Sequence, residues 1–78
     1  MNKQRRSELS KAVELLEQSK ELIEACQEEE QDAFDNLPES IQGSERGEDM
    51  EHYIYEMEQT IDYIDQAIDE IQDEVIDA

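Results

Sequence analysis

The last third of the chain, Met50–Ala78, reads MEHYIYEMEQTIDYIDQAIDEIQDEVIDA. Apolar residues recur in it at alternating steps of four and three, without exception. This is the spacing of the a and d positions of a heptad repeat, which form one apolar seam along a helix. The stretch therefore predicts a long helix that packs against another helix through this seam. The seam residues are Met50, Ile54, Met57, Ile61, Ile64, Ile68, Ile71, Val75 and Ala78.

The size and charge of the chain favour self-association. It has 78 residues, of which 36% are hydrophobic, and a net charge of −18. A domain this small buries a modest share of its surface and is marginally stable alone. Self-repulsion opposes a compact monomer further. Isoleucine at both a and d positions favours more than two helices around a seam. We therefore expect an all-α fold, an antiparallel two-helix hairpin that dimerises into a four-helix bundle.

The single predicted domain, residues 1–78, divides into four segments. Residues 1–6 are expected to be a flexible basic end, and residues 7–36 a helix with Ser7 as its N-cap. Residues 37–43 form a turn, in which Pro38 begins one short helical turn that Gly43 stops. Residues 44–77 form the second helix, with Ser44 as its N-cap. Two helices of similar length joined by a short turn make an antiparallel hairpin.

The first predicted helix carries small residues at every seventh position. Such a line lets a second helix approach closely, so we expect Cys26, which belongs to it, to be buried. Lys20, Gln27 and Glu30 continue the apolar pattern, and we expect them at its edge with their polar ends in water. Alternatively, they fix register or oligomeric state. The small line is Ala12, Ser19, Cys26 and Ala33, bordered by Leu9, Leu16 and Ile23 on one side and by Leu15 and Leu22 on the other.

Charge is divided very unevenly along the chain. Residues 1–20 hold five Lys/Arg and three Glu, whereas residues 21–78 hold 21 Asp/Glu and one Arg. Such a chain repels nucleic acid and anionic membranes, and its natural partners are basic surfaces or cations. Like charges one turn apart also weaken a helix, so the missing lysines require a reason beyond solubility. A solvated face is the plainer interpretation of the same residues.

The density of this charge resembles that of a nucleic acid. Twenty net charges along a helix of roughly 50 Å place one charge about every 2.5 Å, against about 1.7 Å for duplex DNA. The pattern therefore predicts an acidic surface that mimics a phosphate backbone. The residues expected to contact a partner are Glu51, Glu58, Asp62, Asp65 and Asp69.

The sequence lacks the residue sets of common active sites. Cys26 is the only cysteine and His52 the only histidine. We find no Ser-His-Asp arrangement, no phosphate-binding glycine loop and no calcium loop, so we expect no enzymatic activity, cofactor or metal. The basic opening is not followed by an apolar run, and we therefore expect neither a signal peptide nor a membrane span, and a cytoplasmic location.

The turn between the helices, Phe34–Glu48, reads FDNLPESIQGSERGE. This block resembles the central block of a family of small acidic helical proteins found in phages and mobile elements of Gram-positive bacteria. The resemblance implies a helical hairpin and a phage-like context. No activity is assigned to that family, so the resemblance carries over no catalytic residue.

Two interpretations of the turn remain open. In the first the block only forms the fold, and Arg46 pairs with Glu39 or Asp35. In the second its polar residues, close to a helix N-terminus, hold an anionic ligand, such as a signalling nucleotide, or bind a partner. That site would consist of Ser40, Gln42, Ser44, Arg46 and Tyr53.

These observations lead to one principal hypothesis and two alternatives. The principal hypothesis is a non-enzymatic, stoichiometric inhibitor from a phage or mobile element, which occupies the basic groove of a nucleic-acid-binding host defence protein. The first alternative is an oligomeric protein that sequesters a small anionic ligand at the turn. The second alternative is a structural or assembly coiled coil without an external partner.

Overall fold

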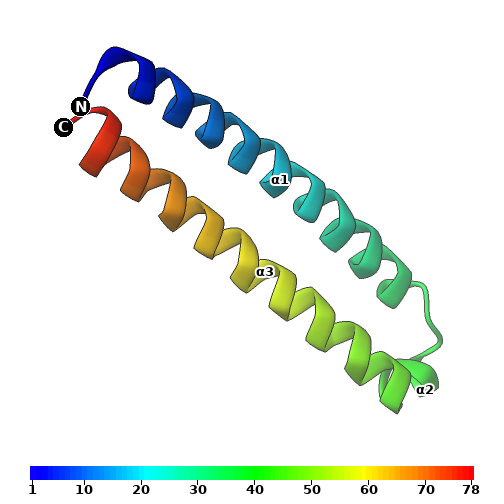
Figure 1. Ribbon diagram of the computed structural model, residues 1–78. Coiled ribbons are helices and arrows are strands. Elements are labelled where there is room, and N and C mark those ends of the chain that lie inside the picture. The colour runs from blue at the N-terminus through cyan, green and yellow to red at the C-terminus, as the bar shows by residue number, and fades with distance from the viewer.

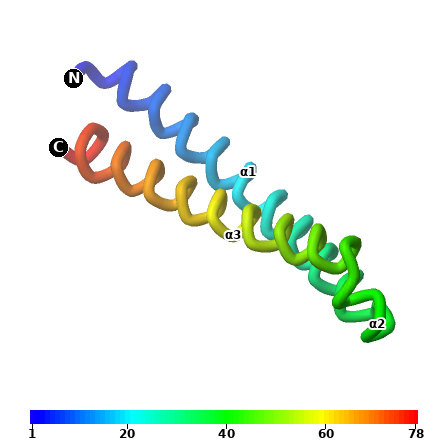
Figure 2. Tube along the Cα trace, turned by 90° about the horizontal axis from the view of Figure 1, so that it is seen from below, coloured from blue at the N-terminus to red at the C-terminus, as the bar shows by residue number.

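The computed structural model describes residues 1–78 and contains only helices, which confirms the all-α prediction. They are α1 (Lys3–Asp35), α2 (Glu39–Gln42), α3 (Glu45–Ile71) and η1 (Gln72–Ile76), a π-helical turn that continues α3. Helices α1 and α3 lie side by side and run in opposite directions, with α2 at the closed end and both termini at the other (Figures 1 and 2). The resulting rod measures 58 × 16 × 12 Å.

The seam of α3 faces α1 as the heptad pattern predicts. Met50, Ile61 and Ile68 are only 7–8% exposed. Ile54, Met57, Ile64, Ile71 and Val75 are half-buried, and only Ala78, at the chain end, is exposed.

The apolar core of this helical pair is thin. Five of the 78 residues are buried, and none of the large side chains is completely enclosed. A pair of helices has only one contact face per helix, so most of each helix surface stays in water. None of the helices contains a stretch long and apolar enough to span a bilayer.

The side of α1 that faces α3 differs from the expected one. Val13 is 5% exposed, whereas the small line and Cys26 are exposed, so the prediction that they are buried was wrong. The observed orientation encloses larger aliphatic and aromatic side chains, which removes more apolar area from water than the small line would. The α1 residues on the contact side are Leu9, Val13, Leu16, Lys20, Ile23, Gln27, Glu30 and Phe34, all buried or half-buried.

Two polar residues of this α1 seam bond to α3. Lys20 Nζ lies 2.7 Å from Asp65 Oδ1. Gln27 Nε2 donates to the carbonyl oxygen of Ile54 at 3.2 Å and to Glu58 Oε2 at 2.7 Å. Because these three contacts connect the helices at fixed levels, they hold the antiparallel register.

Helix α1 begins earlier than expected. Its N-cap is Asn2, whose Oδ1 accepts a hydrogen bond from the Arg5 amide at 2.8 Å. This bond satisfies one of the free donors of the first turn, which is how Asn stabilises a helix start. Residues 3–6 are therefore helical rather than a flexible end, and Ser7 lies inside the helix instead of capping it.

The turn contains the short helix α2, and Gly43 follows it as expected. Ser44 occupies the N-cap position of α3, but its hydroxyl donates back to the Ile41 carbonyl instead of accepting from α3. Gly47 is buried, and a Cβ atom there would lie 2.0 Å from the Gln42 carbonyl oxygen. A glycine is thus required for α2 to pack on the first turn of α3.

Arg46 is exposed and forms no ion pair. The expected pairing of Arg46 with Glu39 or Asp35 was therefore wrong. The turn is held by backbone and amide bonds instead, such as that from Gln42 Nε2 to the Phe34 carbonyl oxygen at 3.1 Å.

Candidate binding site: an acidic groove

A shallow groove runs along one side of the rod between α1 and α3, and we call it the acidic groove. Ile54 and Ile68 from the α3 seam form part of its lining. Carboxylates from both helices form its rims. They are Glu14, Glu17, Glu21, Glu24, Glu28 and Asp32 from α1, and Glu51, Glu58, Asp65, Asp69 and Asp77 from α3 and the residues after it.

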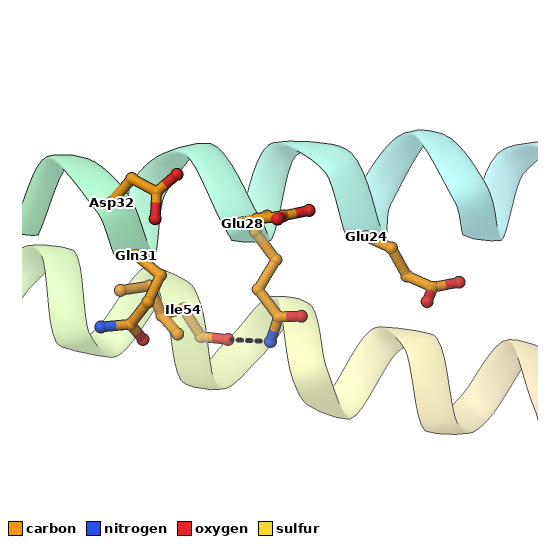
Figure 3. Close-up of a pocket in the computed structure, with 6 residues that line it drawn as sticks. Glu24, Glu28, Gln31, Asp32 and Ile54 are labelled. Atoms are coloured by element: carbon orange, nitrogen blue, oxygen red, sulfur yellow. Dashed lines mark hydrogen bonds between the residues drawn. The ribbon is translucent and has the colours of Figure 1, made fainter.

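The stretch along the C-terminal part of α1 illustrates how the groove is built. Glu24, Glu28 and Asp32 come from α1, while Ile54 comes from α3 beneath them (Figure 3). The amide of Gln27 spans the floor through its bond to the Ile54 carbonyl. The three carboxylates are exposed, so they retain their hydration and remain available to a partner.

Lys20 is the only cation that lines the groove. Its hydrogen bond to Asp65 is the largest cause that raises its pKa above the ordinary 10.5, and the charges of Asp65, Glu24 and Glu17 add to it. Partial desolvation acts in the opposite direction. Because Lys20 is engaged with Asp65, it does not neutralise the remaining carboxylates, and no other ion pair forms in the chain.

Four of the five predicted contact residues line the groove: Glu51, Glu58, Asp65 and Asp69. The fifth, Asp62, is exposed on α3 one turn from Glu58 and does not take part in the lining. Two of the four are already engaged, since Glu58 accepts from Gln27 and Asp65 pairs with Lys20. Glu58 and Asp65 thus connect the two helices that form the groove. Glu51 and Asp69 have no side-chain partner in the chain.

Sequence reasoning missed the carboxylates that α1 contributes. Their signal is present in the sequence, because they follow one another at steps of three and four on a single helix flank. The sequence prediction places the small line on the contact side of α1, and in that orientation these carboxylates have no common role. They are Glu14, Glu17, Glu21, Glu24 and Glu28.

The residues of the second candidate site, at the turn, are not bonded to one another. No hydrogen bond joins any two of its five residues. Gln42 and Ser44 bond to backbone carbonyls, and Ser40, Arg46 and Tyr53 are exposed. The first turn of α3 also carries Glu45 and Glu48, which oppose an anion at that helix end. Binding of an anionic ligand at the turn stays a prediction.

Other chemistry-bearing side chains are dispersed. No group of three or more His, Cys, Asp or Glu side chains is arranged to hold a metal ion. His52 is exposed beside Tyr53, with the ring centroids 6.1 Å apart.

Comparisons with protein-family models, with curated proteins and with solved structures found no match. The family resemblance of the turn block therefore stays a prediction.

Proposed function

We propose that this chain is a non-enzymatic binding protein whose acidic groove occupies the basic surface of a nucleic-acid-binding protein. One observation carries the proposal. Carboxylates from both helices converge on one groove, and the single cation there is already paired with Asp65. Lysine and arginine side chains of a partner would supply the missing positive charge, and bidentate arginine contacts suit carboxylates well.

The charge spacing supports mimicry of a nucleic acid. A net charge of −18 over a length of 58 Å corresponds to about one charge per 3.2 Å. Duplex DNA carries about one per 1.7 Å. We infer that the helical hairpin pairs with a second copy into a four-helix bundle. Two copies side by side would reach about one charge per 1.6 Å, close to the density of the duplex.

The biological setting follows from the turn block. Its resemblance to phage and mobile-element proteins favours a cytoplasmic inhibitor of a host defence protein, which acts by occupancy and not by chemistry. Such an inhibitor would displace DNA or RNA from the groove it fills. Its affinity would fall as salt rises, because the interaction between exposed charges is screened.

A displacement assay tests this function. Labelled duplex DNA is bound to each member of a panel of basic DNA-binding proteins from a Gram-positive bacterium, and the chain is titrated in. We expect release of DNA from at least one member, with a midpoint that rises steeply with salt. Release from none of them would contradict the proposal.

Two matched triple variants separate the groove side from net charge. Glu51→Gln/Asp62→Asn/Asp69→Asn removes three charges at or beside the acidic groove and leaves Glu58 and Asp65 in place. Asp49→Asn/Glu56→Gln/Glu70→Gln removes three exposed charges from α3 outside the groove lining. We expect the first to weaken displacement at least about tenfold more than the second. Equal losses would show that net charge alone governs binding.

A further inference from the structure

A second apolar seam lies on the exposed side of α1. Ala12, Leu15, Ser19, Leu22 and Cys26 follow one another at steps of three and four, and all five are exposed. Leu15 and Leu22 are 62% and 70% exposed, among the most exposed large apolar side chains of the chain. We call these five residues the outer seam.

The outer seam and the acidic groove lie on opposite flanks of α1. Each seam residue is followed two positions later by a groove carboxylate, as Leu15 is by Glu17 and Leu22 by Glu24. Two residues correspond to about 200° around an α-helix. Whatever covers the outer seam therefore leaves the groove open.

We propose that the outer seam is the interface of a homodimer, in which the α1 helices of two copies pack antiparallel about a two-fold axis at Ser19. The spacing of the seam is nearly symmetric about that residue. Leu15 lies four residues before Ser19 and Leu22 three after it, so each Leu15 meets Leu22 of the second copy. Ala12 and Cys26, seven residues on either side, meet in the same way. The small side chains let the two helices approach closely.

The distribution of charge along α1 favours a second copy of this chain as the partner at the outer seam, and it favours antiparallel packing of the two α1 helices. Residues 1–11 carry four Lys/Arg and one Glu, a net charge of +3. Residues 21–35 carry seven Asp/Glu and no base, a net charge of −7. Antiparallel packing places the basic end of each α1 beside the acidic end of the other. Parallel packing would place the two acidic ends together, which like-charge repulsion disfavours.

The same seam explains how two chains of charge −18 associate at all. No side chain of the outer seam is charged, and the flank of α3 next to it offers Thr60 and Ala67, which are exposed and uncharged. Burying Leu15 and Leu22 in both copies also extends a core that is thin in one copy. This interface does not rest on the proposed binding of a basic protein, because its tests measure association of the chain with itself and contain no basic partner.

Cysteine cross-linking tests the axis. A disulfide requires Cα atoms about 4.4–6.8 Å apart. In the antiparallel dimer the two Cys26 residues are separated by about 21 Å along the helices, so the unaltered chain should not cross-link under mild oxidation. Ser19→Cys in a Cys26→Ala background should cross-link on the axis, and Ala12→Cys with Cys26 retained should cross-link between positions 12 and 26. Efficient Cys26–Cys26 cross-linking in the unaltered chain, or none in either variant, would overturn the arrangement.

Sedimentation equilibrium tests the surface itself. Leu22→Glu places a charge in each copy of the seam, and we expect the dimer dissociation constant to rise at least about tenfold. Gln31→Glu adds the same charge on the groove flank of α1 and should leave the constant within about twofold. Circular dichroism checks that both variants keep their helices. A chain that stays monomeric across the micromolar range, or equal effects of the two substitutions, would refute the proposal.

Discussion

Gly47 is the residue on which the packing of the turn depends. Gly47→Ala would bring a Cβ atom to 2.0 Å from the Gln42 carbonyl oxygen, a backbone atom that can move only with α2. We expect a loss of about 1–3 kcal/mol in the free energy of unfolding, the range of overpacked sites. Urea unfolding followed by helical circular dichroism measures it.

Gly43 provides the matched control for this prediction. Nothing lies within 4 Å of a Cβ atom added there, and its φ of −85° suits any residue. Gly43→Ala should therefore change stability by less than about 1 kcal/mol. If both substitutions behaved alike, close packing of α2 on α3 would not be the reason for Gly47.

The Lys20–Asp65 pair gives a pH-dependent prediction. Asp65→Asn replaces the charged acceptor that raises the pKa of Lys20 with a neutral amide, so Lys20 should titrate at a lower pH in the variant. Because the folded-state pKa is the raised one, the stabilisation by the pair is fully present below the unfolded pKa. It is lost as pH rises above 10.5 and through the folded pKa.

Two measurements test whether the stabilisation by the Lys20–Asp65 pair is lost as pH rises. The Lys20 side chain is titrated by NMR in both proteins, and their urea stabilities are compared at neutral and strongly alkaline pH. The advantage of the unaltered chain over Asp65→Asn should shrink at alkaline pH. An identical Lys20 titration in the two proteins would show that the pair does not form in solution.

At the scale of whole elements, α3 was predictable and α1 was not. Every a and d position of α3 is apolar, so only one orientation toward a neighbour is possible. Helix α1 carries two apolar patterns at steps of three and four, one through Val13 and Phe34 and the other through Leu15 and Leu22. Its sequence alone does not decide which of them packs on α3. Because the small line was predicted to face α3, Cys26 was predicted to be buried. The glutamates of α1, which are about half of the candidate site, were therefore not recognised.

The polar positions in the α1 seam predict where the helix can be stabilised. Glu30 is half-buried on the contact side and its side chain has no partner there. Glu30→Leu should raise the free energy of unfolding by about 1–2 kcal/mol, because apolar area is buried where a charge was partly desolvated. Urea unfolding at a fixed protein concentration measures the gain.

The control for Glu30→Leu lies two residues away. Glu28→Leu removes the same charge from an exposed position on the groove rim. It should give only the smaller gain that comes from reduced repulsion. Equal gains would mean that relief of charge, and not burial in the seam, stabilises the helix.

At the scale of the whole molecule, the two flanks of the rod differ in their side chains. One flank collects carboxylates in the acidic groove, and the other leaves an uncharged apolar seam on α1. A single copy is therefore left with both unpaired charge and uncovered leucines. The proposed self-association through the outer seam would cover these leucines and bring the carboxylates of two copies close together. Dimerisation and binding of a basic partner would therefore be compatible.

Salt should act on the isolated chain and on its complex in opposite directions. At about 0.01 M salt the screening length is about 30 Å, so charges interact over half the rod, whereas at about 1 M it is about 3 Å. Self-repulsion of the −18 charge is then screened, and we expect the unfolding temperature to rise by several degrees, since about 1 kcal/mol corresponds to about 4–8 °C at this size. The unfolding temperature of the variant Asp49→Asn/Glu56→Gln/Glu70→Gln, which has three fewer charges, should rise less.

Displacement of DNA from a basic protein should weaken over the same range of salt, because the attraction between the chain and the basic protein is screened equally. An unfolding temperature that fell with added sodium chloride would show that attractive pairs outweigh repulsion in the folded rod, and the carboxylates would then be satisfied within the chain instead of available to a partner.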